Sequence, residues 1–313
     1  MHLNQGGRVM SLTRRDFVKI CGGTVAGLGI SQMVHPGLLM AMEEGAQKAP
    51  VIWVQGQGCT GCSVSLLNAV HPSIKEVLLK IISLEYHPTV MAAQGELAME
   101  QLFEVADQYE GKFFFAVEGS IPKGADGKYC YVGEKDGKHI TMLEMTKMLG
   151  KKCAATLSLG TCSAFGGIPA AWGNLTDAAP VTQIYQENGI EKPVINVPGC
   201  PPHPDWMVGT IAHVLLYGIP ELDTHLRPKL FFGSNIHDNC SYRGYYDQGI
   251  MSKTFTDKKG CRYELGCKAP FANADCWKRR WNNGVNWCVE NAVCTGCVEP
   301  GFPDSMSPFY EIV

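Results

Sequence analysis

The sequence lacks the features that mark several common classes of protein. No apolar run reaches the roughly 18 residues that a membrane-spanning helix needs. Lys and Arg number 27 against 30 Asp and Glu, a net charge of −3, so there is no basic field that would bind nucleic acid. With 45% apolar residues, most of the chain is not disordered. What remains is an ordinary folded protein of 313 residues, with about two domains.

The 14 cysteines are too sparse for a disulfide-built scaffold. They make up about 4.5% of the 313 residues, roughly half the density of a short secreted disulfide protein. A chain of this length also buries a core without covalent cross-links. The cysteines therefore have another task, such as binding a metal.

Residues 1–49 resemble a twin-arginine export signal. Thr13-Arg14-Arg15-Asp16-Phe17-Val18-Lys19 precedes a weakly apolar run, residues 20–30, that contains four glycines. Those glycines disfavour the alternative, a charged amphipathic first helix. Small residues offer cleavage points near Ala41, Ala46 and Ala49. The expected location is the periplasm, where disulfides are the default for paired cysteines, so that alternative stays open.

Residues 50–220 alternate short apolar runs with helical patterns, which predicts a doubly wound parallel α/β domain. The predicted strands are Val51–Val54, Phe113–Val117, Cys153–Leu157 and Val194–Val197. The predicted helices are Ser63–Asn68, Ile74–Ile82, Glu96–Ala106, Thr141–Leu149 and Asp205–Leu216. Residues 221–313 have few long apolar runs, and we expect an irregular domain that something other than a hydrophobic core organises.

Three cysteine-bearing loops each follow a predicted strand. They contain Cys59 and Cys62, then Cys162, then Cys200. Because the carboxyl ends of parallel strands lie along one edge of a sheet, these four thiols should converge on one point. The glycines of the loops let the backbone approach a thiolate cluster and direct amide groups toward it.

The second half supplies two more groups of soft ligands. One is His237, Cys240, Cys261 and Cys267, and the other is Cys276, Cys288, Cys294 and Cys297. Three groups of four fit three 4Fe-4S clusters, with Cys130 and Cys153 left over as core residues. Zinc at the first group and disulfides remain alternatives, although the 13 cysteines left after signal removal cannot all pair.

The chain resembles the small subunit of nickel-iron hydrogenases along nearly its whole length. Besides the leader and the C-terminal ligand run, the matching motifs are Cys59-Thr60-Gly61-Cys62-Ser63, Val117-Glu118-Gly119-Ser120-Ile121-Pro122, Gly160-Thr161-Cys162-Ser163-Ala164-Phe165-Gly166-Gly167 and Pro198-Gly199-Cys200-Pro201-Pro202-His203-Pro204. This resemblance implies a flavodoxin-like domain followed by a largely irregular cluster-binding domain. It also implies a large partner subunit that holds the nickel-iron centre, so this chain itself would not cleave hydrogen.

The resemblance implies a role for each ligand. Cys59, Cys62, Cys162 and Cys200 would hold the proximal cluster, nearest the catalytic metal. His237, Cys240, Cys261 and Cys267 would hold the distal cluster near the surface, where a histidine suits an exposed position. Cys276, Cys294 and Cys297 match the ligands of the medial cluster, and Cys288 would be its fourth.

Cys288 points to one branch of the family. In the commoner members a proline follows the tryptophan here, and the medial cluster has three cysteines and three irons. Cys288 after Trp287 resembles the nickel-iron-selenium branch, whose medial cluster is 4Fe-4S. Gly61, where oxygen-tolerant relatives add a cysteine, favours an ordinary proximal cluster. Glu118 lies in a motif near the catalytic interface, and a role in positioning or proton movement is a hypothesis.

The expected function is electron transfer in an exported hydrogenase heterodimer during oxidation of dihydrogen or reduction of protons. The expected partners are the large subunit, with selenocysteine expected in this branch, and a periplasmic multihaem cytochrome c. The rival from another class is a non-enzymatic periplasmic module stabilised by disulfides or zinc. A closer rival is the cluster-bearing subunit of respiratory complex I, which shares the proximal motif but lacks the export signal and the C-terminal ligands.

Overall fold

The computed structural model describes residues 48–70, 72–282, 284 and 287–312. Residues 1–47 of the predicted export signal, including Arg14, Arg15 and Cys21, lie outside the described residues. Ala49, one of the expected cleavage points, already begins the first strand. No helix in the described part of the chain combines the length and apolarity needed to cross a bilayer.

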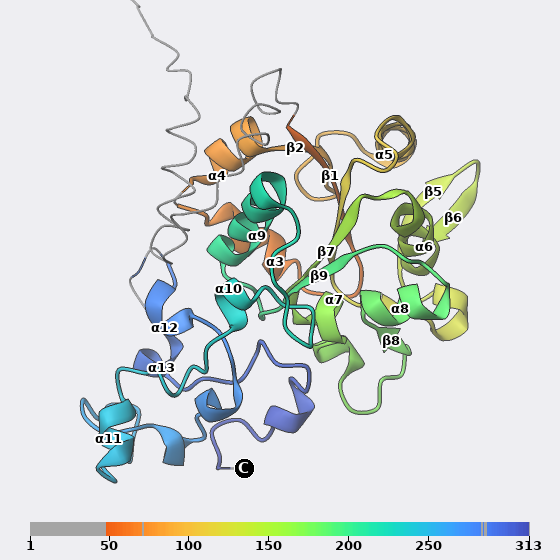
Figure 1. The fold of residues 1–313 in the computed structure, drawn as a ribbon. Helices are drawn as coiled ribbons and strands as arrows, with labels where there is room; N and C mark the ends of the chain where they lie inside the picture. Colours follow the sequence, from red (N-terminus) through yellow and green to blue (C-terminus); the bar gives the residue numbers. More distant parts are fainter. Residues whose placement is uncertain (1–47, 71, 283, 285–286, 313) are drawn as a thin grey trace, which may run out of the picture.

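A five-stranded parallel sheet forms the centre of the first half (Figure 1). Its strands are β1 (Ala49–Gln55), β2 (Ile82–Tyr86), β3 (Phe114–Glu118), β7 (Ala155–Leu159) and β9 (Val194–Val197). The spatial order is β2-β1-β3-β7-β9, and every neighbouring pair is parallel. This is the strand order of flavodoxin-like folds, which confirms the predicted fold class.

Alternating side chains of the sheet pack against helices on both faces. In β1, Val51 and Trp53 lie in one core, whereas Ile52 and Val54 lie in the other. The helices of the first core are α3 (Gly61–Leu67), α4 (Ile74–Glu76), the π-helix η2 (Val77–Ile81) and α9 (Pro204–Tyr217), and those of the second are α5 (Gly95–Gln108), α6 (Met142–Lys152) and α8 (Val181–Glu187). Figure 1 shows the two sets on opposite sides of the sheet. Because both faces are covered, the strands read as continuous apolar runs.

Shorter elements connect this framework. They are β4 (Ile121–Pro122) paired with β8 (Ala178–Ala179), the hairpin of β5 (Tyr131–Lys135) and β6 (Lys138–Thr141), the helix α7 (Gly160–Phe165), and the 3₁₀ turns η3 (Gly124–Gly127) and η4 (Ile168–Ala170). Helix α7 begins directly after β7, so it brings its N-terminal residues to the carboxyl edge of the sheet.

Two features of the structure differ from the predictions. The helix expected over 74–82 is present over residues 74–81 as α4 and η2, but the edge strand β2 that follows it, Ile82–Tyr86, was not predicted. A capping box between Ser73 and Glu76 starts this helix. The pairing of Ala49 with Ile82 then draws the chain into the sheet. Cys153, expected inside a strand, lies at the C-terminal end of α6, where it is fully buried.

Residues 221–313 are largely irregular, as predicted. Their short helices are α10 (Lys229–Phe232), α11 (Arg243–Asp247), α12 (Cys276–Arg279) and α13 (Cys288–Asn291), with 3₁₀ turns η5 (Tyr263–Leu265), η6 (Ala269–Phe271) and η7 (Asp304–Met306). The division into domains at residues 49, 220 and 313 stays a prediction.

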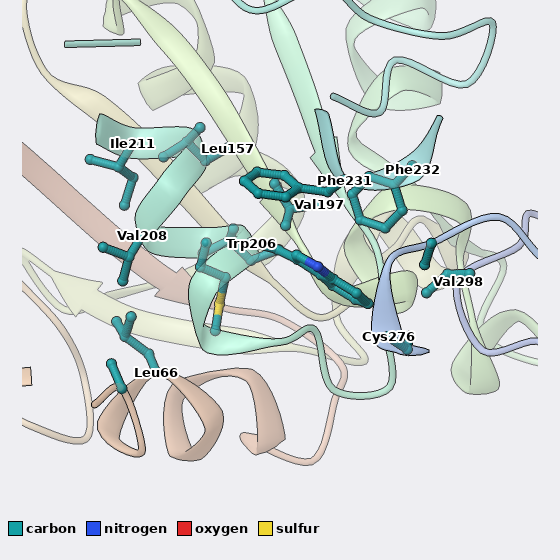
Figure 2. Close-up of a cluster of buried hydrophobic side chains, with 14 of the residues drawn as sticks. Leu66, Leu157, Val197, Trp206, Val208, Ile211, Phe231, Phe232, Cys276 and Val298 are labelled. Atoms are coloured by element: carbon teal, nitrogen blue, oxygen red, sulfur yellow. The ribbon is translucent and has the colours of Figure 1, made fainter. Parts of the chain in front are cut away.

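The expectation that no hydrophobic core organises the second half was wrong. Phe231, Phe232, Trp287 and Val298 join the core that lies on the α9 face of the sheet. At the centre of this core, the ring of Trp206 lies 5.0 Å from that of Phe232, and Figure 2 shows Cys276 and Val298 near the same indole ring. The aromatic residues are scattered along the sequence, so no local apolar run reveals that they meet on the sheet.

Candidate metal centres

The first group of cysteines lies at the carboxyl edge of the sheet, beside the point where the strand order reverses. The loop after β1 carries Cys59, the first turn of α3 carries Cys62, α7 carries Cys162, and the turn after β9 carries Cys200. The thiol of Cys62 interacts electrostatically with the other three, so the structure brings all four together. Ligand crevices of open α/β sheets form at this position.

Glycine allows the close approach of these loops. A Cβ atom on Gly160, which has φ +84°, would lie 2.5 Å from Cys62 Sγ. A Cβ atom on Gly167, which has φ +54°, would lie 2.9 Å from Cys162 Sγ. Both positions therefore require glycine for their backbone conformation and for space around the sulfur atoms.

Glu118, the last residue of β3, holds the loop that carries Cys59 and Cys62. Its buried carboxylate accepts hydrogen bonds from the backbone N–H groups of Cys62 at 2.9 Å and Ser63 at 3.2 Å. It also accepts from Trp53 Nε1 at 3.0 Å, from Gln55 Nε2 at 3.2 Å and from the Ser63 hydroxyl. The two backbone donors belong to the first turn of α3, where an anion stabilises the free amides of the helix.

Ser63 links Glu118 to His87 through hydrogen bonds of its hydroxyl group. Ser63 Oγ lies 3.0 Å from His87 Nε2, and Thr89 N–H donates to His87 Nδ1 at 3.3 Å. Because Nδ1 accepts a hydrogen bond, Nε2 carries the proton and donates to Ser63. Burial lowers the pKa of His87, which favours this neutral form. Sequence reasoning missed Ser63 and His87; the only signal was the serine that ends the first cysteine motif.

The second group is formed by Cys276 at the start of α12, Cys288 at the start of α13, and Cys294 and Cys297 in the following turn. Side chains of Cys288 and Cys294 hydrogen-bond to each other. Cys276 interacts electrostatically with Cys297 and Cys288. The structure thus places Cys288 near the other three, and it also lies within electrostatic reach of Cys240 and Cys267 of the third group. The interaction with Cys294 lowers the pKa of the Cys288 thiol.

The third group contains Cys240, Cys261 and Cys267. The thiol of Cys240 interacts electrostatically with those of Cys267 and Cys261. His237 shares a turn with Cys240, since Cys240 N–H donates to His237 O at 3.2 Å. The imidazole packs edge-on against Tyr246 at 4.6 Å, and His237 is only 8% exposed. The exposed position expected for this histidine is therefore wrong for this chain.

Burial opposes ionisation of most of these thiols, and repulsion between neighbouring thiolates adds to the effect. Burial raises the pKa of Cys162, Cys240 and Cys267 to about 11 and that of Cys297 to about 12, and neighbouring cysteines contribute to the rise in each case. Four thiolates cannot share such a site without cations, so binding of a metal must release protons.

Backbone amides nevertheless point at individual sulfur atoms. Tyr242 N–H donates to Cys240 Sγ at 3.3 Å, and Gly296 N–H donates to Cys294 Sγ at 3.4 Å. Such donors favour the thiolate over the thiol. They are arranged for the charged form of the side chain, which is the form that ligates metal.

Several residues next to these cysteines in the sequence have a buried N–H group without an acceptor among the described residues. These N–H groups include Nε1 of Trp277, Nε1 of Trp287 and Nε of Arg262. Each of these three residues is adjacent in sequence to a cysteine of the second or third group. Inorganic sulfide accepts hydrogen bonds, so the donors and the thiols together fit iron-sulfur clusters.

Disulfides and single metal ions fit the geometry less well. All 13 cysteines of the described chain are free. In the same residues, no group of three or more His, Cys, Asp or Glu is arranged to hold one metal ion. A tetrahedral zinc ion with Zn–S bonds of about 2.3 Å would need its four sulfurs within about 4 Å of one another. The structure gives no support to the disulfide or zinc alternative.

The leftover cysteines lie apart from the three groups. Cys153 is fully buried in the core on the α5 face of the sheet, and Cys130 packs against the same core. Burial raises the pKa of both thiols.

Two family models match the chain. The model described as NADH ubiquinone oxidoreductase, 20 Kd subunit, matches residues 59–214, which contain the first cysteine group. The model described as the C-terminal part of the NiFe/NiFeSe hydrogenase small subunit matches residues 232–310, which contain the other two.

Similar proteins cover nearly the whole chain. The periplasmic [NiFeSe] hydrogenase small subunit of Desulfomicrobium baculatum is 61% identical, over 96% of this chain and 99% of its own. The uptake hydrogenase small subunit of Azotobacter vinelandii is 39% identical, over 97% of this chain and 84% of its own.

Solved structures show the same fold. A reduced, active form of the Ni-Fe-Se hydrogenase from Desulfomicrobium baculatum has a TM-score of 0.83 at 59% identity, covering 85% of this chain and 100% of that chain. The recombinant [NiFeSe] hydrogenase from Desulfovibrio vulgaris Hildenborough has a TM-score of 0.83 at 56% identity, covering 85% and 99%.

We expect the substitution Glu118→Gln to destabilise the fold by about 1–3 kcal/mol, because an amide cannot accept all five hydrogen bonds and leaves buried donors unpaired. The midpoint of urea unfolding, followed by circular dichroism, measures this change. The control is Glu100→Gln at an exposed position of α5, which should stay within about 0.5 kcal/mol. Equal midpoints for the two variants would contradict the anchoring role of Glu118.

Proposed function

Because this chain belongs to the family of nickel-iron and nickel-iron-selenium hydrogenase small subunits, we propose that it conducts electrons through three 4Fe-4S clusters between the nickel-iron site of a large subunit and an external carrier. It is the iron-sulfur electron-transfer subunit of a hydrogenase heterodimer, and the catalytic metals belong to the large subunit. The NADH ubiquinone oxidoreductase model matches the sheet domain only, whereas the hydrogenase model matches the C-terminal segment.

The observation that carries the proposal is that the three cysteine groups form a series. Cys297 of the second group interacts electrostatically with Cys200 of the first. Cys294 of the second group interacts electrostatically with Cys267 of the third. Each group thus adjoins the next. Since electron tunnelling falls steeply with distance, such a series connects a buried site to a distant surface where one group would not.

We assign the first group to the proximal cluster, with ligands Cys59, Cys62, Cys162 and Cys200. The second group would hold the medial cluster through Cys276, Cys288, Cys294 and Cys297, and the third would hold the distal cluster through His237, Cys240, Cys261 and Cys267. Each cluster, when bound, would accept and release one electron. The protein supplies thiolates, backbone amides aimed at sulfur, and glycines that make room for the loops.

Cys288 decides the type of the medial cluster. We expect the purified complex to contain about twelve irons in this chain and to show no three-iron signal by electron paramagnetic resonance (EPR). Substitution Cys288→Pro removes one thiolate from the second group, so we expect about one iron fewer and a new three-iron signal. The matched control is Cys153→Ala, which removes a buried cysteine outside the three groups and should leave the iron count unchanged. A three-iron signal in the unsubstituted complex would remove Cys288 from the ligands.

An apolar surface beside the first group fits the large subunit. Trp172 and Leu175, in the loop that follows η4, are 94% and 92% exposed, and Ile168 is 55% exposed. Cys59 is itself exposed. Large exposed apolar side chains beside a site that needs protection from water mark a protein interface. Because the proximal group should lie nearest the catalytic metal, the large subunit is the partner expected here.

Substitution Trp172→Ala should weaken binding of the large subunit by about 2 kcal/mol, the cost typical of a tryptophan that anchors an interface. Sedimentation of the diluted complex measures the dissociation. The control is Ile219→Ala, which is 48% exposed just beyond the C-terminal end of α9, at the opposite edge of the sheet. Equal dissociation of both variants would place the interface elsewhere.

Several finer assignments rest on the family resemblance. The relative named periplasmic supports export to the periplasm, and the sequence of residues 13–19 supports the twin-arginine route. Similarity to NiFeSe hydrogenases supports a selenocysteine in the large subunit, and a multihaem cytochrome c is the proposed carrier at the distal group. Retention of an Arg14→Lys, Arg15→Lys variant in the cytoplasm tests the export route. The selenium content of the purified complex tests the selenocysteine, and reduction of a multihaem cytochrome c by dihydrogen tests the carrier. A Glu118→Gln enzyme with unchanged turnover would dismiss a part for Glu118 in proton movement.

A further inference from the structure

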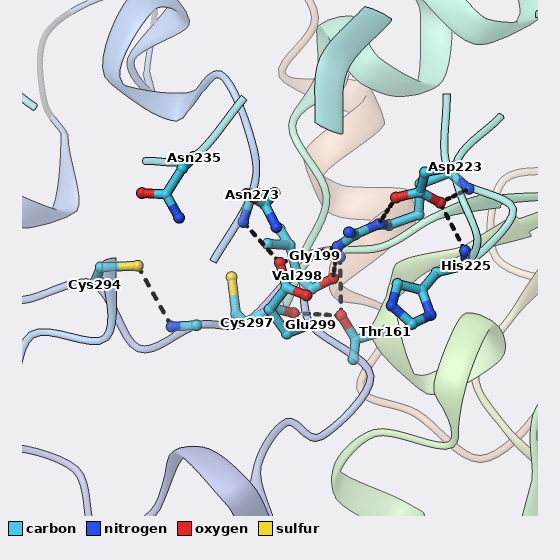
Figure 3. Close-up of polar contacts among 12 residues, drawn as sticks. Thr161, Gly199, Asp223, His225, Asn235, Asn273, Cys294, Cys297, Val298 and Glu299 are labelled. Carbon is cyan, nitrogen blue, oxygen red and sulfur yellow. Dashed lines mark hydrogen bonds and ion pairs between the residues drawn. The ribbon is translucent and has the colours of Figure 1, made fainter. Parts of the chain in front are cut away.

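The junction between the first and second cysteine groups is built around one hydroxyl group. Thr161, in the first turn of α7, is 1% exposed and immediately precedes Cys162 of the first group. Its hydroxyl donates a hydrogen bond to the backbone oxygen of Cys297, a member of the second group that is 136 residues away. Figure 3 shows this contact between the sheet edge and the C-terminal turn.

The same threonine also binds the loop that carries Cys200. Gly199 N–H donates to Thr161 Oγ1 at 2.9 Å, and Thr161 N–H donates to Gly199 O at 3.0 Å. The hydroxyl therefore accepts from one cysteine loop and donates to another. A single side chain joins the strand ends of β7 and β9 to the turn at Cys297.

This arrangement brings Cys200 and Cys297 close enough for their side chains to interact electrostatically. A cysteine of the first group thus neighbours a cysteine of the second. Because Thr161 holds the backbone on both sides of this contact, it governs the gap between the two groups.

The residues after Cys297 are held from a different direction. Arg227, which is 2% exposed, donates to Val298 O at 3.1 Å and to Glu299 Oε1 at 3.0 Å. Asn273 N–H donates to the same Glu299 oxygen at 2.7 Å. These contacts fix the residues after Cys297 to the segment around Arg227, which itself bonds to Asn196 of β9. Loss of the Thr161 hydroxyl would therefore free the Cys297 carbonyl oxygen from α7 while the rest of the turn stays attached.

We propose that Thr161 is a positioning residue for electron transfer: its hydroxyl sets the spacing of Cys200 and Cys297 and provides a hydrogen-bonded route between the proximal and medial groups. The inference rests on the function proposed above. Replacing the hydroxyl by a methyl group would leave Gly199 N–H and Cys297 O without these partners. The two backbones would then move apart, and the electronic coupling between the groups would fall.

The test uses the purified heterodimer with three substitutions. Thr161→Val keeps the shape of the side chain and removes the hydroxyl, and Thr161→Ser keeps the hydroxyl. Thr210→Val is the matched control, because the hydroxyl of Thr210 is also buried and donates at 2.6 Å to a backbone oxygen, that of Trp206 within α9. Iron and sulfide content is measured first, and the complexes are then frozen at intervals after mixing with dihydrogen for EPR.

In Thr161→Val we expect the medial signal to appear several-fold later than in the native complex, while the proximal signal keeps its rate and Thr161→Ser and Thr210→Val behave as native. Selective loss of medial iron in Thr161→Val, with full iron in the other two variants, would equally support the positioning role. Native rates and full iron in Thr161→Val, or equal defects in Thr161→Val and Thr210→Val, would overturn it. A native complex without iron and sulfide would instead refute the proposed function itself.

Discussion

Burial of the cysteine thiols, with repulsion among neighbouring thiolates added to it, is the constraint on which the three cysteine groups depend. Burial and the neighbouring cysteines raise the pKa of Cys162 and Cys267 to about 11, so neither site can hold its charged ligands without metal. The fold compensates locally. Backbone amides point at the sulfurs of Cys240 and Cys294, and glycines bring the loops close to Cys62 and Cys162. The three groups are thus prepared for cofactors that add positive charge, and their serial order follows from where the sheet and its neighbouring segment place them.

The two halves of the chain share the hydrophobic core on the α9 face of the sheet. The parallel sheet brings distant loops to a common edge, and Glu118 at the end of β3 ties the first of these loops to the sheet. The second half has little regular structure of its own. It is organised because Phe232 and Trp287 join the core around Trp206, and because Trp206 Nε1 donates to Asp275 at 2.7 Å, next to Cys276. Ligand positions in the irregular half are therefore set by packing against the regular one.

Much of the framework could be predicted from the sequence because its signals are local. Strands β1 and β9 are buried on both faces and read as short apolar runs, and their glycine-rich loops mark the cysteines that follow. The edge strand β2 has a mixed burial pattern rather than a continuous apolar run, so it was missed. The hydrogen bond from Ser63 to Glu118 and that from Thr161 to Cys297 join residues 55 and 136 positions apart, so no local pattern could indicate them. The convergence of Cys59, Cys62, Cys162 and Cys200 was predictable, because the ends of parallel strands share one edge of the sheet.

The arrangement of ligands along the chain also sets an order of assembly during synthesis. Every cysteine of the first group precedes residue 201 and follows a strand of the sheet. That site has all its ligands while the last third of the chain is still to be translated. The other two sites need residues as far along as Cys267 and Cys297, which dock onto an existing sheet surface. The first cysteine group can thus form before the chain is complete, whereas the third group can form only after Cys267, and the second only after Cys297, has been synthesised.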